Sequence, residues 1–241
     1  MIDWLHAMIL PRYPALGVLA LALLLGGCQG TSAPAASQQI TPSYALTYVA
    51  VGASDAFGVG TDDPARQSWP SVLASELSGR THLINLGIPG ATVAQAQRLE
   101  APIALTVYPN VITVWLALND YNANVPLAAY AQQLQALITT LRMGTGARIY
   151  VGNLPDLTLL PFFAARDPAQ LRAADAAWNA AIARVCAATG AHLVDIYAAF
   201  AVVAQHPEYL SSDGLHPSDA GAQQLADYFA AAIKADGQHE K

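Results

Sequence analysis

Five short β-type runs alternate with helical patterns along most of the chain, and this alternation limits the folds that the chain can adopt. The runs are Tyr44–Val51, Leu83–Leu86, Val111–Leu118, Arg148–Gly152 and His192–Ile196. Apolar residues at helical spacing lie between these runs, as in Leu127–Leu141 and Ala169–Ala188, and again after the last run, in Ala222–Ile233. Strands that alternate with helices predict a parallel sheet with helices on both faces. We therefore predict one α/β domain with a five-stranded parallel sheet over residues 44–241.

The first 43 residues carry a different pattern, which is typical of an export signal followed by a tether. Ala15–Leu25 is an unbroken apolar run, well short of the roughly 20 residues that span a bilayer. It leads into Leu25-Gly26-Gly27-Cys28, which resembles the bacterial lipobox, where the cysteine is diacylated and becomes the first mature residue. The alternative is an uncleaved membrane anchor that ends at a chance cysteine. We expect a signal peptide at 1–27, a lipidated Cys28 and a flexible tether at 28–43.

These segments predict an exported protein that a lipid anchor holds at a membrane. Residue 29 is Gln rather than Asp, so the inner-membrane retention signal is missing. We therefore expect the outer membrane, with the domain facing the periplasm or the cell surface. The segment before the apolar run carries Asp3 and one basic residue, Arg12, so a start at Met8 rather than Met1 is an alternative.

Charge and cysteine content exclude other partners and groups. The formal net charge is −6 and there is no basic run, whereas nucleic-acid binding needs clustered Lys and Arg, so we expect no nucleic-acid partner. No His, Asp or Glu cluster has metal-ligand spacing, so we expect no metal or other cofactor. A Cys28–Cys186 disulfide competes with lipidation, but Cys186 lies in a predicted helix as a small buried hydrophobe.

Candidate reactive residues follow the predicted strands, at the edge of the sheet where α/β proteins gather their sites. Ser54 comes just after the first strand, between Gly52 and Gly58, which allow a tight turn that exposes the hydroxyl. A serine hydroxyl becomes a nucleophile only when a base takes its proton. His216 is such a base, with Asp213 three residues before it in a turn ahead of the last helix. The alternative for this pair is a helix-entry loop with two solvated polar residues.

Two further residues can stabilise the negative charge that develops in acyl transfer. Asn119 ends the predicted strand Val111–Leu118, where its side-chain amide can donate a hydrogen bond. Gly90, in the segment Gly87–Thr92, can bring a backbone N–H close to the same point. The alternatives are a turn asparagine and a loop glycine.

Four blocks in this order resemble those of the SGNH hydrolase superfamily, also called GDSL-type esterases and lipases. The blocks are Gly52-Ala53-Ser54-Asp55, Asn85-Leu86-Gly87-Ile88-Pro89-Gly90, Ala117-Leu118-Asn119-Asp120 and Asp213-Gly214-Leu215-His216. The resemblance implies a flavodoxin-like three-layer α/β/α sandwich and metal-free hydrolysis of esters or thioesters. It implies Ser54 as the nucleophile, His216 as the general base and Asp213 as the residue that orients the base. It also implies an oxyanion hole formed by the N–H groups of Ser54 and Gly90 and the side chain of Asn119.

Two positions depart from the family pattern. The Asp that usually precedes the serine is Ala53 here, and Asp55 follows the serine instead. The Gly that usually opens the third block is Ala117, whose methyl group could crowd the loop that presents Asn119. Neither departure removes a catalytic group.

We therefore expect a serine esterase, similar to a lysophospholipase or lipase, that cleaves a small-molecule ester through an acyl-enzyme. The alternatives are a carbohydrate O-acetyl esterase and a catalytically silent surface-binding lipoprotein with the same fold. An α/β-hydrolase is disfavoured because Ala56 stands where its Gly-x-Ser-x-Gly elbow needs Gly. The apolar segment Leu154–Phe163 either lines an acyl pocket, which favours aliphatic esters, or packs on the core. The oligomeric state is unknown from sequence.

Overall fold

One parallel sheet organises the domain, and its strand order is β2-β1-β3-β4-β5. The computed structural model describes residues 44–77 and 80–239; Cys28, the predicted signal peptide (1–27) and the tether (28–43) lie outside the described residues. The strands are β1 (Leu46–Gly52), β2 (Thr81–Asn85), β3 (Val111–Trp115), β4 (Arg148–Gly152) and β5 (His192–Val194). This order is that of flavodoxin-like folds, so the predicted five-stranded parallel α/β fold is confirmed.

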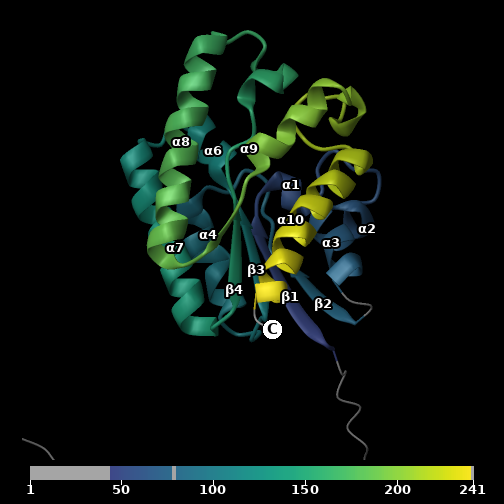
Figure 1. Ribbon diagram of the computed structural model, residues 1–241, viewed down its shortest axis with the longest axis vertical. Helices are drawn as coiled ribbons and strands as arrows, with labels where there is room; N and C mark the ends of the chain where they lie inside the picture. Colours follow the sequence, from purple (N-terminus) through teal and green to yellow (C-terminus); the bar gives the residue numbers. More distant parts are fainter. Residues whose placement is uncertain (1–43, 78–79, 240–241) are drawn as a thin grey trace, which may run out of the picture. The chain divides into compact units, whose positions relative to one another are not determined.

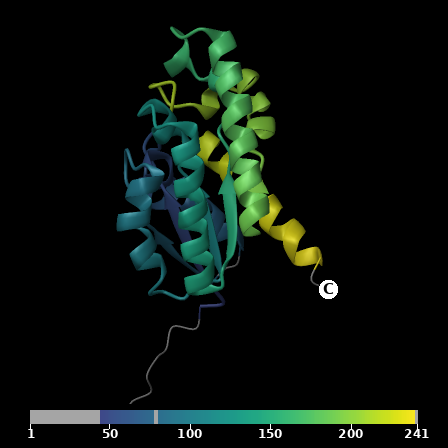
Figure 2. The same cartoon turned by 90° about the vertical axis from the view of Figure 1, so that its left-hand side faces the viewer.

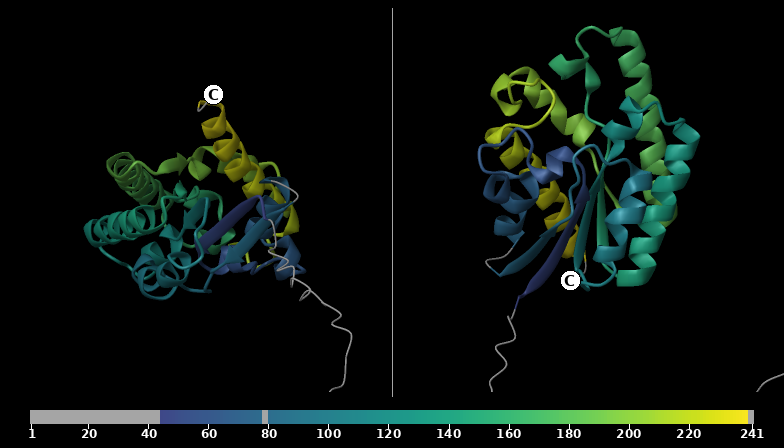
Figure 3. Two further views of the ribbon diagram at one scale, coloured as in Figure 1. Left: turned by 90° about the horizontal axis from the view of Figure 1, so that it is seen from below. Right: turned by 180° about the vertical axis from the view of Figure 1, so that it is seen from behind.

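Two layers of helices cover the two faces of the sheet, as Figures 1 and 2 show. On one face, α3 (Trp69–Leu77) packs against α10 (Asp219–His239). The other face is covered by α4 (Val93–Leu99), α5 (Ala101–Ala104), α7 (Leu127–Thr145) and α8 (Pro168–Thr189). Figure 3 shows both layers from below and from behind. Because both faces are covered, the central strands β1 and β3 are apolar and buried along most of their length.

The remaining elements are short and gather mainly at the carboxyl edge of the sheet. They are α1 (Ser54–Phe57), α2 (Pro64–Gln67), α6 (Ala117–Asn122), η1 (Leu157–Leu159), η2 (Pro161–Phe163), α9 (Ile196–Ala199), η3 (Phe200–Ala204) and η4 (Pro207–Tyr209). Within the described residues, no helix combines the length and apolar character needed to cross a bilayer.

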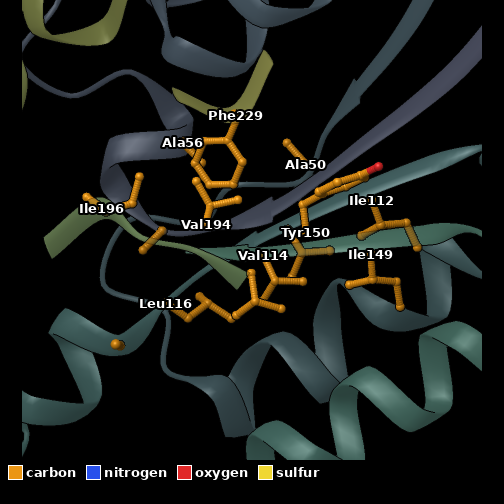
Figure 4. Close-up of a cluster of buried hydrophobic side chains, with 14 of the residues drawn as sticks. Ala50, Ala56, Ile112, Val114, Leu116, Ile149, Tyr150, Val194, Ile196 and Phe229 are labelled. Carbon is orange, nitrogen blue, oxygen red and sulfur yellow. The ribbon is translucent and has the colours of Figure 1, made fainter. Parts of the chain in front are cut away.

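Aromatic and branched side chains fill the core between the sheet and the helices. Trp69 of α3 and Phe229 of α10 are buried and stacked, with ring centroids 4.5 Å apart. Figure 4 shows Phe229 beside Val194 of β5 and Tyr150 of β4, so one cluster joins helix and sheet. Burial of such side chains supplies most of the free energy that holds the layers together.

The predicted helices are confirmed, but two predicted strands extend into what are helices. Gly190 ends α8 with a left-handed backbone, as expected of a C-cap. The run Val111–Leu118, by contrast, is a strand only to Trp115, because the chain turns into α6 at Ala117. Asn119 therefore lies inside a short helix and does not end a strand. The run His192–Ile196 is a strand only to Val194, because Asp195 caps α9.

Candidate active site

Ser54 is placed by an abrupt change from strand to helix at the end of β1. The strand ends at Gly52, and Ser54 is the first residue of α1. A Cβ on Gly52 would lie 2.5 Å from the Cβ of Ala56, closer than any van der Waals contact allows. The tight turn that exposes the serine hydroxyl therefore requires glycine at position 52.

The structure brings His216 and Asp213 to this hydroxyl. The Nε2 atom of His216 lies 2.8 Å from Ser54 Oγ, although 162 residues separate the two in sequence. On the other side of the ring, Nδ1 donates to Asp213 Oδ2 at 2.6 Å. Nε2 is then free to accept the serine proton, so the three side chains form one hydrogen-bonded relay.

Asp213 is held in its turn by a set of hydrogen bonds. Its Oδ1 accepts from the hydroxyl of Ser211 and from the backbone N–H groups of Leu215 and His216, at 2.8–2.9 Å. Burial acts to raise the pKa of Asp213, but these bonds and the one from the His216 ring outweigh it and hold the pKa well below its usual range. The carboxylate therefore stays ionised and fixes the imidazole tautomer.

A neighbouring segment braces the same turn. Gly214 has a φ of 68°, which a residue with a side chain rarely adopts, and a Cβ there would lie 2.7 Å from Pro161 Cβ. The N–H of Phe162 donates to Gly214 O at 3.1 Å. The 3₁₀ turn η2 is thus bonded directly to the turn that carries Asp213 and His216.

Gly90 and Asn119 line the same cavity as Ser54 and His216. Asn119 Nδ2 donates to Ala91 O at 3.0 Å, which ties α6 to the loop after β2. Because an asparagine amide carries two hydrogens, the second one is available to a ligand. Both predicted oxyanion donors therefore belong to the cavity lining that also includes Ser54.

The two departures from the family pattern are accommodated in the core. Ala53 is buried, and its carbonyl oxygen accepts a hydrogen bond from Phe57 N–H at 2.9 Å. Ala117 is buried at the start of α6, and Asn119 still lines the cavity. The methyl group at position 117 therefore does not exclude Asn119 from the site.

Sequence reasoning missed a buried carboxyl group that bonds to the nucleophile turn. Glu100 is buried and accepts from Gly52 N–H at 2.9 Å. Burial raises the pKa of Glu100 to about 8, with a further contribution from the charge of Asp55, and burial raises the pKa of Asp55 to about 6. Glu100 is therefore mostly protonated near neutral pH. No local pattern marks this contact, which joins positions 48 residues apart.

An apolar cavity of about 480 Å³ extends from the relay into the domain. Its apolar lining comes from the ends of β3 and β4 and from η2, η3 and α10, and includes Trp115, Leu160, Phe162, Phe200, Val203 and Leu225. The segment Leu154–Phe163 both packs on the core and lines the cavity, so the two interpretations of its sequence hold together. Leu157 and Phe163 pack in the core, while Leu160 and Phe162 line the cavity.

The described part of the chain contains no group of three or more His, Cys, Asp or Glu side chains that could hold a metal ion. Cys186 is free and buried, and burial raises its thiol pKa to about 11, so it is unreactive.

The sequence model of the GDSL-like lipase/acylhydrolase family matches residues 50–224. No curated protein sequence matches the chain.

Three solved structures share the fold at low sequence identity. A lipase/acylhydrolase from Enterococcus faecalis is similar with a TM-score of 0.65 and 20% identity, over 79% of this chain and 96% of that one. The esterase EstA from Pseudoalteromonas sp., inhibited by monoethylphosphonate, is similar with a TM-score of 0.63 and 18% identity, over 79% and 97%. An acetyl xylan esterase variant from Geobacillus stearothermophilus is similar with a TM-score of 0.63 and 18% identity, over 79% and 95%.

Proposed function

The chain belongs to the GDSL-like lipase/acylhydrolase family of SGNH hydrolases and is an ester-hydrolysing enzyme, and from this premise we propose that it works through an acyl-enzyme on Ser54. The observation that carries the proposal is the relay itself. A serine hydroxyl, an imidazole and an ionised carboxylate are joined by hydrogen bonds of 2.8 and 2.6 Å at the mouth of a cavity.

The first half of the reaction acylates the serine. Ser54 Oγ attacks the carbonyl carbon of the ester while its proton passes to His216 Nε2, and Asp213 stabilises the imidazolium. The negative charge that develops on the carbonyl oxygen is stabilised by hydrogen bonds from the N–H groups of Ser54 and Gly90 and from Asn119 Nδ2. The C–O bond to the leaving alcohol then breaks, and the alcohol takes the proton from His216.

The second half releases the acid. His216 takes a proton from a water molecule, whose oxygen attacks the acyl carbon and forms a second tetrahedral intermediate. The bond to Ser54 Oγ breaks, and the proton returns from His216 to the serine. The net change is one water consumed for each ester converted into acid and alcohol.

The cavity favours aliphatic acyl esters or thioesters over acetylated carbohydrate, and in this respect the enzyme is lipase- or lysophospholipase-like. Its lining is mostly apolar side chains, which bind alkyl chains well and sugar hydroxyls poorly. A carbohydrate O-acetyl esterase is the alternative, because an acetyl xylan esterase has the same fold. A catalytically silent binding lipoprotein is disfavoured, because such a protein has no need of an ordered relay.

Hydrolysis of p-nitrophenyl esters by purified protein tests the proposal. We expect Ser54→Ala to lower kcat by on the order of 10⁴-fold or more, because the nucleophile is lost. Ser75→Ala is the matched control, since Ser75 lies on exposed α3 surface and its hydroxyl bonds only to Val72 O. Equal rates for the wild type and Ser54→Ala would rule out Ser54 as the nucleophile.

We also propose that the enzyme is anchored at the outer membrane through lipid on Cys28. The support is the lipobox-like sequence Leu25-Gly26-Gly27-Cys28 and Gln at position 29. In cells, Cys28→Ala should move the protein from the membrane fraction to the soluble fraction or leave its signal uncleaved, whereas Cys186→Ala should do neither. A mature N-terminus other than a diacylated Cys28, found by mass spectrometry, would contradict this.

A further inference from the structure

The cavity beside Ser54 is also lined by η3. Leu160, Phe200, Val203 and Leu225 are all buried, yet each lines the cavity. Side chains that are shielded from solvent and still face empty space show that the cavity enters the interior. Ser54 and His216 line this space together with Phe200 and Val203 of η3.

We propose that the buried part of this cavity binds the acyl chain of the substrate, and that Phe200 and Val203 of η3 set the longest chain it accepts. This inference rests on the proposed serine-esterase function and goes further by naming the specificity-determining residues.

The chemistry of the lining selects an uncharged aliphatic group. No Lys or Arg is among the described residues that line the cavity, and the Asp and His among them are Asp55, next to Ser54, and His216. A phosphate or carboxylate placed deep inside would lose its hydration without gaining a counter-charge. A headgroup or alcohol therefore stays at the mouth, and the straight hydrocarbon of the acyl group fills the interior.

Tyr228 of α10, which lines the cavity, holds the start of η3 in place. The hydroxyl of Tyr228 donates to Ala199 O at 3.0 Å, so α10 is bonded to the residue that precedes η3. Because η3 is bonded in this way, it resists displacement by a longer acyl chain.

Asn153, at the end of β4, anchors the start of the same segment. Its Nδ2 donates to Asp195 Oδ1 at 2.8 Å, and its Oδ1 accepts from Tyr197 N–H at 2.9 Å. Its backbone carbonyl accepts from Trp115 Nε1, whose ring lines the cavity. The segment that begins with α9 and continues into η3 is therefore fixed to the end of β4. A fixed segment makes a sharp limit on acyl-chain length physically reasonable.

A series of p-nitrophenyl esters from acetate through butyrate, hexanoate, octanoate and decanoate tests the inference. Each methylene that enters the cavity should raise kcat/KM by about fourfold until the cavity is full. Val203→Phe should fill the space and lower the octanoate-to-acetate ratio of kcat/KM by about tenfold or more, because two or more methylenes are excluded. Phe200→Ala should act in the opposite sense and move the optimum to longer chains.

Ile103→Phe, a comparable enlargement on the exposed surface of α5, is the matched control and should leave the preference unchanged. Circular dichroism confirms that each variant is folded, and the two η3 variants test the inference independently. A Ser54-dependent activity whose chain-length preference is unchanged in folded Phe200→Ala and Val203→Phe would overturn the inference and leave the proposed function standing. Absence of any Ser54-dependent ester hydrolysis would overturn both.

Discussion

The two halves of the catalytic relay are held in place by different means. Ser54 follows a buried strand, and the backbone N–H of Gly52 just before it is bonded to buried Glu100. The turn with Asp213 and His216 lies nearer the surface, where the two side chains are 45% and 17% exposed. Its shape depends on hydrogen bonds within the turn and on the contact with η2.

This difference predicts how stability and activity should vary in the two regions. In the sequence, α1 begins at Ser54, while α10, visible in Figure 1, begins at Asp219, just after the base. Substitutions at the nucleophile end should change stability and activity together, because that end is part of the core. Substitutions at the base end should lower activity by more than the stability that they cost would explain.

The largest effect should come from His216→Ala. We expect kcat to fall by on the order of 10⁴-fold or more, because neither half-reaction has a base, while Tm changes little. Ester hydrolysis and thermal unfolding of the same preparation measure the two quantities. His206→Ala removes an exposed histidine paired with Glu208 outside the cavity and is the control. A large fall in Tm for His216→Ala would break the comparison.

Asp213→Asn should lower kcat by on the order of 10³- to 10⁴-fold, since the amide no longer favours the productive tautomer. Ester hydrolysis by the purified variant measures this loss.

The same variant should also change how the stability of the protein depends on pH. The folded-state pKa of Asp213 lies below its unfolded value, so its contribution to stability is present above the unfolded pKa of about 3.9 and is lost as pH falls towards the folded value. Urea unfolding between pH 5 and pH 3 should therefore show a smaller loss of stability in Asp213→Asn than in the wild type. Parallel curves would argue against an ionised carboxylate held by the turn.

Two glycine substitutions compare the ends directly. Gly52→Ala should lower the free energy of unfolding by about 1–3 kcal/mol, because its methyl group meets Ala56 inside the core. Gly214→Ala should cost about 1–2 kcal/mol through its positive φ, with additional displacement against Pro161. For each kcal/mol of stability lost, kcat should fall more in Gly214→Ala than in Gly52→Ala. Equal ratios of kcat loss to stability loss would remove the distinction between the two ends.

The smallest effect on catalysis should come from Glu100→Gln, which keeps an acceptor for Gly52 N–H. Because burial raises the folded-state pKa of Glu100 to about 8, the protonated form is favoured in the fold, and stability is lost as pH rises from the unfolded value of about 4.3 towards 8. Glu100→Gln should show a weaker decline over this window in urea unfolding. Glu100→Ala, which leaves the N–H unpaired, should cost about 1–3 kcal/mol. The same pH slope in Glu100→Gln and the wild type would show that Glu100 is not the titrating group.

The strands and long helices could be predicted because each repeats one spacing of apolar residues. Their alternation along the chain leaves few arrangements other than a parallel sheet covered by helices. The end of β3 could not be predicted, because Leu116 and Leu118 are apolar and an apolar run does not distinguish a strand from a buried helix. The proximity of Ser54 and His216 followed from their places at one edge of the sheet. The contact of Glu100 with Gly52 had no such signal, because it depends on how the loop after α4 packs beneath β1.

Labelling with a fluorophosphonate, followed by peptide mapping, tests the central claim most directly, because the reagent forms a covalent bond only with an activated serine. The account predicts a single labelled peptide that contains Ser54, and loss of the label in His216→Ala. Label on a different serine, or a folded wild-type protein that takes up none, would contradict it.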